Sequence, residues 1–112
     1  GGHMKRQDRT QIEKDKLMTV FKEIDANKLE FVSNQIDDLA WLIVACDELK
    51  DKIDKEGAVI KYNNGGGQSG VKDNPNVKTL IAYQKNKISI TKQLIELVPV
   101  KSKSKLQEFL NG

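Results

Sequence analysis

The stretch VSNQIDDLAWLIVACDELKDKI, residues 32–53, decides the fold because its apolar residues recur in alternating steps of three and four. This spacing predicts one long helix over residues 28–56, about 43 Å long at ~1.5 Å per residue. Gly57 fits the position just past the end of such a helix. The seam, which skips Lys50, consists of Val32, Ile36, Leu39, Ile43, Cys46 and Ile53.

The segment LAWLIVAC, residues 39–46, widens this apolar seam. Ala40, Trp41, Leu42 and Val44 add apolar surface on neighbouring faces of the helix. A helix that is apolar over more than one face needs more than one packing partner. We therefore expect Trp41 to lie in the core or at a subunit interface.

A second long helix is predicted after the glycine-rich stretch. Asn74 and Pro75 form a typical helix start, with an N-cap residue followed by proline at the first helical position. Pro99 stops the helix. Its seam, with two polar members, consists of Val77, Leu80, Ile81, Gln84, Ile88, Thr91, Leu94, Ile95 and Val98.

Shorter elements flank the two long helices. Residues 5–11 lack apolar periodicity and are expected to form a flexible basic N-terminus. A helical pattern then begins at Ile12, and either Asp25 or Asn27 would cap the helix that follows it. Residues 58–62, AVIKY, suit a short extended piece, and LQEFL in the basic tail, residues 99–112, suits a short helical turn.

These elements predict an all-α fold. We expect a long antiparallel helical hairpin with an N-terminal helix packed on it, a glycine-rich crossover loop and a short C-terminal helical turn. The helical core domain would span residues 12–98.

Composition narrows the class of protein. A chain of 112 residues forms one domain at most, and its 31% charged and 5% aromatic residues are typical of helical bundles. One cysteine excludes an internal disulfide and fits a reducing compartment. Residues 1–4, GGHM, are typical of an expression-tag remnant, so His3 is set aside. His3 is the only histidine, so without it the chain lacks the residue that most general-base catalysis uses.

Charge is distributed unevenly along the chain. Residues 1–22 carry a net charge of +3, residues 23–58 carry −6, residues 59–71 carry +1 and residues 72–112 carry +5. Basic ends indicate a polyanionic partner, and the acidic middle indicates either repulsion or a basic partner. The alternative is that these charges form ordinary solvated helix faces.

Two nucleotide-binding motifs are excluded. GGGQSG matches G-x-G-x-x-G, but the next helix opens four residues later, and position 90, where an acidic residue would be needed, is isoleucine. The sequence SGVKD lacks the Gly-Lys-Ser/Thr of a P-loop. Gly65, Gly66, Gly67 and Gly70 are better explained by tight turning, although exposed amides in such a loop could also contact phosphate.

The sequence contains only weak candidates for a metal site or a catalytic nucleophile. Asp47 and Asp51 lie one helical turn apart and could hold a divalent ion, but interleaved lysines favour a solvated acidic face. Cys46 lies on the apolar seam and is expected to be a buried core residue without a histidine to activate it. We expect no catalytic residues, no metal and no cofactor.

Residues 12–105 resemble the small subunit of phage terminase, in the family common in tailed phages and prophages of Gram-positive bacteria. The shared order is an apolar helix, the turn Glu56-Gly57, an extended segment, a glycine-rich loop and a closing helix. The matching positions are Tyr62, Asn63, Gly65, Gly66, Gln68, Gly70, Lys72, Asn74, Pro75, Leu94 and Pro99.

The resemblance implies a role in viral genome packaging in the host bacterial cytoplasm. Terminase small subunits recognise the packaging site on phage double-stranded DNA, assemble as homo-oligomeric rings and regulate the large subunit. The large subunit carries the ATPase and nuclease, so the small subunit is not an enzyme. The C-terminus of this chain looks short, so a tail that contacts the large subunit could be reduced here.

Basic and apolar residues supply candidates for these contacts. The DNA-binding candidates are Lys5, Arg6, Arg9, Lys14, Lys16, Lys78, Lys85, Lys92, Lys101, Lys103 and Lys105. The candidates for the oligomer interface are Trp41, Leu42, Ile43 and Val44. The alternative function is a helical adaptor that binds another protein through its acidic hairpin, without any membrane partner in either case.

Overall fold

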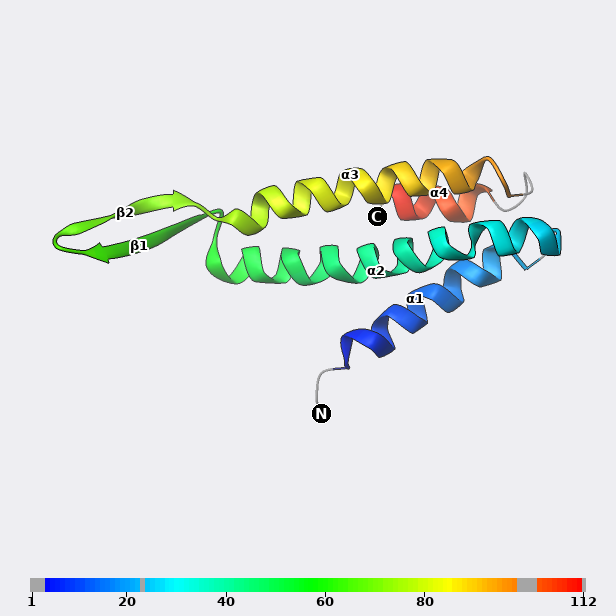
Figure 1. The fold of residues 1–112 in the computed structure, drawn as a ribbon, viewed down its shortest axis with the longest axis horizontal. Helices are drawn as coiled ribbons and strands as arrows, with labels where there is room; N and C mark the ends of the chain where they lie inside the picture. The colour runs from blue at the N-terminus through cyan, green and yellow to red at the C-terminus, as the bar shows by residue number, and fades with distance from the viewer. Residues whose placement is uncertain (1–3, 23, 99–102, 112) are drawn as a thin grey trace.

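The computed structural model describes residues 4–22, 24–98 and 103–111. Within these residues, four helices and one β-hairpin form an elongated structure with extents of 63 × 33 × 21 Å (Figure 1). The elements are α1 (Arg6–Val20), α2 (Ala26–Glu56), β1 (Val59–Gly65), β2 (Gln68–Asp73), α3 (Pro75–Ile95) and α4 (Lys103–Asn111).

The long helices α2 and α3 pack side by side as an antiparallel hairpin, as the sequence predicts. Asp25 is the residue that caps α2, and its carboxylate accepts a hydrogen bond from the Asn27 N–H at 2.9 Å. Gly57 ends α2 with a φ of 88°, a value that glycine adopts at no steric cost. The expected N-cap and proline at the start of α3 are confirmed.

The glycine-rich crossover is not an irregular loop, and this part of the all-α prediction is wrong. β1 and β2 pair as an antiparallel hairpin, with Val59 opposite Asp73 at its base and Gly65 opposite Gln68 at its tip. A register irregularity lies between Asn63 and Gly65. Three consecutive glycines at the tip, residues 65–67, have φ between 59° and 81°, which lets the chain reverse direction there.

Both ends of the chain contain more helix than expected. α1 begins at Arg6 and not at Ile12, although no apolar residue precedes Ile12 in it. At the other end, the expected short turn is α4, which is nine residues long. Pro99, expected to stop α3, lies outside the described residues, and α3 ends before it at Ile95.

The hydrophobic core lies at one end of the molecule, where all four helices meet. There, α1 packs on α2, and α4 packs on α3 and α1. Its buried residues are Leu17, Val20, Phe21, Val32, Ile36, Leu39, Ala40, Leu94, Val98 and Leu106. The other half of the molecule consists of the second half of α2, the first half of α3 and the β-hairpin, and the first turns of α1 reach it near Asp47 and Glu48 (Figure 1).

Asn74 joins the end of α2 to the start of α3 and is only 2% exposed. Its side-chain oxygen accepts a hydrogen bond from the Asn76 N–H at 3.0 Å, which caps α3. Its amide nitrogen donates to Gly57 O at 2.9 Å and to Glu56 Oε1 at 3.1 Å. One buried side chain therefore fixes both helices at the base of the β-hairpin.

We expect Asn74→Ala to lower the free energy of unfolding by about 2–4 kcal/mol, because it removes a helix cap and also the part-buried hydrogen bonds to Gly57 and Glu56. Asp25→Ala is the matched control, since it removes only an exposed cap and should cost about 1 kcal/mol. Urea unfolding followed by circular dichroism measures both values. Equal losses for the two variants would contradict the role of Asn74 as a joint.

Candidate nucleic-acid interface

A row of three lysines runs along the outer side of α3. Lys78, Lys85 and Lys92 are all exposed, and the spacing of seven residues places them about 10.5 Å apart along the helix at ~1.5 Å per residue. They lie opposite the side on which the buried residues Thr91 and Leu94 face the core. Among the described residues, no carboxylate forms an ion pair with any lysine of this row.

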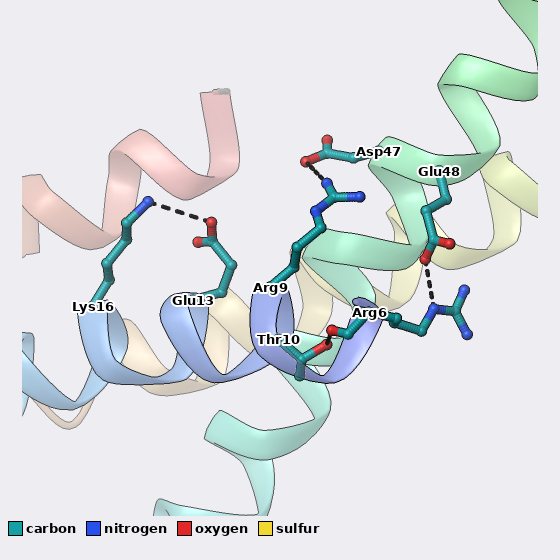
Figure 2. Close-up of polar contacts among 7 residues, drawn as sticks. All are labelled: Arg6, Arg9, Thr10, Glu13, Lys16, Asp47 and Glu48. Carbon is teal, nitrogen blue, oxygen red and sulfur yellow. Dashed lines mark hydrogen bonds and ion pairs between the residues drawn. The ribbon is translucent and has the colours of Figure 1, made fainter. Parts of the chain in front are cut away.

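The basic residues of α1, in contrast, are engaged within the chain. Arg6 Nε lies 2.5 Å from Glu48 Oε1, and Arg9 Nη2 lies 3.5 Å from Asp47 Oδ2 (Figure 2). Lys14 Nζ lies 2.6 Å from Asp37 Oδ1. Much of the positive charge of the N-terminus is thus matched by the acidic face of α2.

These ion pairs explain where α1 begins. Its buried residues, Leu17 and Val20, lie near its C-terminal end, so its first turns lie against α2 mainly through charged side chains. The side chains in these pairs are between 35% and 52% exposed, which limits each pair to about 0–1 kcal/mol. A polyanion could therefore compete with α2 for these residues at little cost.

The remaining basic candidates lie in different settings. Lys16 pairs with Glu13 on the same helix, with Nζ 3.3 Å from Oε1 (Figure 2). Lys5 is exposed just before α1, and Lys103 is half-buried at the start of α4. Lys101 and the side chain of Lys105 lie outside the described part of the structure. Among the candidates that the structure describes, the α3 row shares one helix face, whereas those of α1 lie beside α2.

Trp41 stands apart from the other residues assigned to a subunit interface. Its ring is 41% exposed and meets Tyr83 edge-on, with centroids 5.6 Å apart. The guanidinium of Arg6 lies 5.2 Å from the centre of the Trp41 ring. Leu42 and Val44 are buried within the chain, and Ile43 is half-buried against its own core. Of the four residues, Trp41 is the one most accessible to a partner.

Sequence reasoning missed two candidates in the β-hairpin, Lys61 and Lys72. Both are exposed, and no acidic residue occurs between Gly57 and Lys72. The signal was the pair of short segments VIKYNNG and QSGVKD, separated by two glycines, which is the pattern of a hairpin.

The structure offers few groups for catalysis. Burial raises the pKa of the Cys46 thiol, and the nearby charges of Lys87 and Lys50 offset this only in part. Asp47, one of the two carboxylates considered for a divalent ion, faces Arg9. Within the described ranges, no group of three or more histidine, cysteine or acidic side chains could hold a metal ion. No helix there is both long and apolar enough to cross a membrane.

Comparisons with protein-family models, curated proteins and solved structures give no match to this chain.

We expect Cys46 in the folded protein to react with a thiol-specific reagent at neutral pH at least about tenfold more slowly than in urea, because a buried, protonated thiol is a poor nucleophile. The reaction with an aromatic disulfide reagent, followed by absorbance, measures both rates. Similar rates in the folded and unfolded states would show that Cys46 is accessible.

Proposed function

We propose that this protein is a non-catalytic DNA-recognition subunit of a phage packaging machine, equivalent to the terminase small subunit. The observation that carries the proposal is the α3 lysine row, which is exposed and has no ion-pair partner among the described residues. The sequence resemblance supplies the biological context. Action in the host bacterial cytoplasm and regulation of the large terminase subunit rest on that resemblance alone.

The lysine row suits the phosphate backbone of duplex DNA. From Lys78 to Lys92 it spans about 21 Å at ~1.5 Å per residue, which equals roughly six base pairs at ~3.4 Å each. Lysines contact phosphates as point charges and release counterions, so binding would be strong at low salt and weak at high salt. The exposed α1 ion pairs are also strongest at low salt, so Arg6, Arg9 and Lys14 would contact DNA only where phosphates displace their carboxylate partners.

Self-association is the second part of the proposal. Ile81 is 48% exposed and Ile88 is 37% exposed, and they lie beside the lysine row on α3. Phe31 is 70% exposed and Trp41 is 41% exposed on α2. Apolar surface on two different helices fits a head-to-tail contact between copies, and repetition of such a contact closes into a ring.

The adaptor function finds less support. It needs a free acidic face on α2, but Asp37, Asp47 and Glu48 already pair with α1. A partner that binds this protein without DNA, through Asp38, Asp51 or Asp54, would favour the adaptor.

We expect the triple variant Lys78→Gln, Lys85→Gln, Lys92→Gln to bind duplex DNA more weakly, with a shallower dependence of log affinity on log salt. The slope should fall by about 0.9 for each phosphate that the variant no longer neutralises. The variant Lys50→Gln, Lys52→Gln, Lys55→Gln is the matched control, since it removes the same charge from α2. Fluorescence anisotropy over a salt series measures both. Equal effects of the two variants would mean that net charge, and not the α3 row, governs binding.

We also expect native mass, measured by light scattering at low and high salt, to correspond to several copies. The double variant Ile81→Gln, Ile88→Gln should lower this mass, whereas Ala82→Gln, also at an exposed position on α3, should not. A wild-type monomer under all conditions, with and without DNA, would contradict self-association.

A further inference from the structure

The β-hairpin projects beyond the helices and adds nothing to the hydrophobic core (Figure 1). Every residue from Lys61 to Ser69 is exposed, and so are Val71, Lys72 and Asp73. A two-stranded hairpin that packs on nothing is only marginally stable. A projecting element of this kind contributes little to the fold, so its sequence is explained better by what it contacts outside the chain.

The hairpin has two chemically different faces, because side chains alternate along each strand. On one face, Val59 lies opposite Asp73, Lys61 lies opposite Val71 and Asn63 lies opposite Ser69. We call this the open face. The other face carries Tyr62 opposite Gly70 and Ile60 opposite Lys72, and we call it the braced face.

The braced face stiffens the hairpin. The Tyr62 ring lies over the backbone of Gly70, so a methyl group added at Gly70 would come within 3.0 Å of Tyr62 Oη. At the tip, the side chain of Asn63 accepts a hydrogen bond from the Gly65 N–H at 2.8 Å, which fixes the turn. The open face is therefore held in shape before any ligand arrives.

The open face has the chemistry of a surface that contacts base edges. The central residues of the two strands line a shallow hollow, and three of them, Lys61, Ser69 and Val71, belong to the open face. In the major groove, lysine donates hydrogen bonds to guanine, serine bonds with several bases, and an apolar side chain contacts the thymine methyl group. Lys61 and Lys72 outnumber Asp73, which lies on the open face at the base of the hairpin, so the hairpin carries a net charge of +1.

The size and position of the hairpin fit the same ligand. The major groove of B-DNA is about 12 Å wide and admits a two-stranded ribbon. The hairpin is also joined closely to the lysine row, because β2 ends at Asp73 and α3 begins at Pro75, with the buried Asn74 between them. Phosphate contacts on α3 would therefore set the position of the hairpin on the duplex.

We propose that the open face of the β-hairpin reads base sequence in the major groove of duplex DNA, while the α3 lysine row contacts the phosphates. This inference rests on the proposed function and names the element that provides its sequence preference. Lys61, Ser69 and Val71 make the base contacts. Lys72, on the opposite face, contributes only charge.

The two hairpin lysines provide a matched test. Lys61→Gln and Lys72→Gln each remove one charge from an exposed strand position, and neither position is in the core. Wild-type protein first selects a preferred duplex from a randomised library. Anisotropy then measures, for each variant, the ratio of affinities for the preferred duplex and a scrambled one. Circular dichroism confirms that each variant keeps its helices.

We expect Lys61→Gln to lower this affinity ratio by about tenfold, the scale of a single base contact, and Lys72→Gln to leave the ratio unchanged. Val71→Ser should lower the ratio as well. Equal effects of the two lysine variants on the ratio, or no effect of Lys61→Gln, would overturn the inference. Loss of oligomer mass in Val71→Ser, with an unchanged ratio, would also overturn it and assign the open face to contacts between copies.

The proposed function and this inference fail in different ways. Wild-type protein that binds no duplex at low salt contradicts both. Wild-type protein that binds with steep salt dependence but selects no sequence overturns the inference and leaves the proposed DNA binding intact.

Discussion

The structure depends on a single constraint: α2 is apolar over too wide an arc for one partner to cover. In its first half, α1 and α3 both pack against it, and α4 adds Leu106 to the same core. In its second half α1 reaches α2 through exposed ion pairs at Asp47 and Glu48, so α3 is left to cover its apolar side chains, and α2 ends where Gly57 turns the chain into the hairpin. The elongated shape and the uncovered apolar side chains follow from this unequal covering.

Within the part of the chain that the structure describes, some charged segments pair with one another, and others stay unpaired. The basic N-terminus and the acidic middle largely neutralise each other where α1 lies against α2. The lysines of α3 and of the hairpin have no such partner among the described residues. Net charge by segment therefore overstates the positive charge that the N-terminus leaves free after folding. An electrostatic function depends on which charges remain free after folding.

The sequence predicts the long helices and their ends well, because apolar spacing and capping residues are local signals. Asp25, Gly57 and Asn74 all lie at the helix ends where their chemistry places them. The first turns of α1 were missed because ion pairs with a distant helix, and not apolar periodicity, hold them in place. The hairpin was missed because β2 contains Gly70 and Lys72, which are weak strand signals, and because its register depends on Tyr62 packing over Gly70.

The candidate site was predictable only in part. The heptad spacing of the α3 lysines is visible in the sequence and places them on one helix face, and the structure shows that this face is exposed. The burial of Leu42 and Val44 could not be read from the spacing alone, because an apolar helix face does not reveal whether its partner is another helix of the same chain or a second copy.

Because the hydrophobic core lies at one end of the molecule, we also expect the two ends not to unfold as a single unit. Backbone amides near Ile36 and Leu94 are protected by four converging helices, whereas those near Ile53 and Val77 are protected by one neighbouring helix. Native-state hydrogen exchange would then proceed from the hairpin end inward, with the hairpin and its supporting helix ends as the first region to open. The end proposed to bind DNA would thus open more often than the four-helix end, and a ligand bound there would shift the balance back toward the folded hairpin.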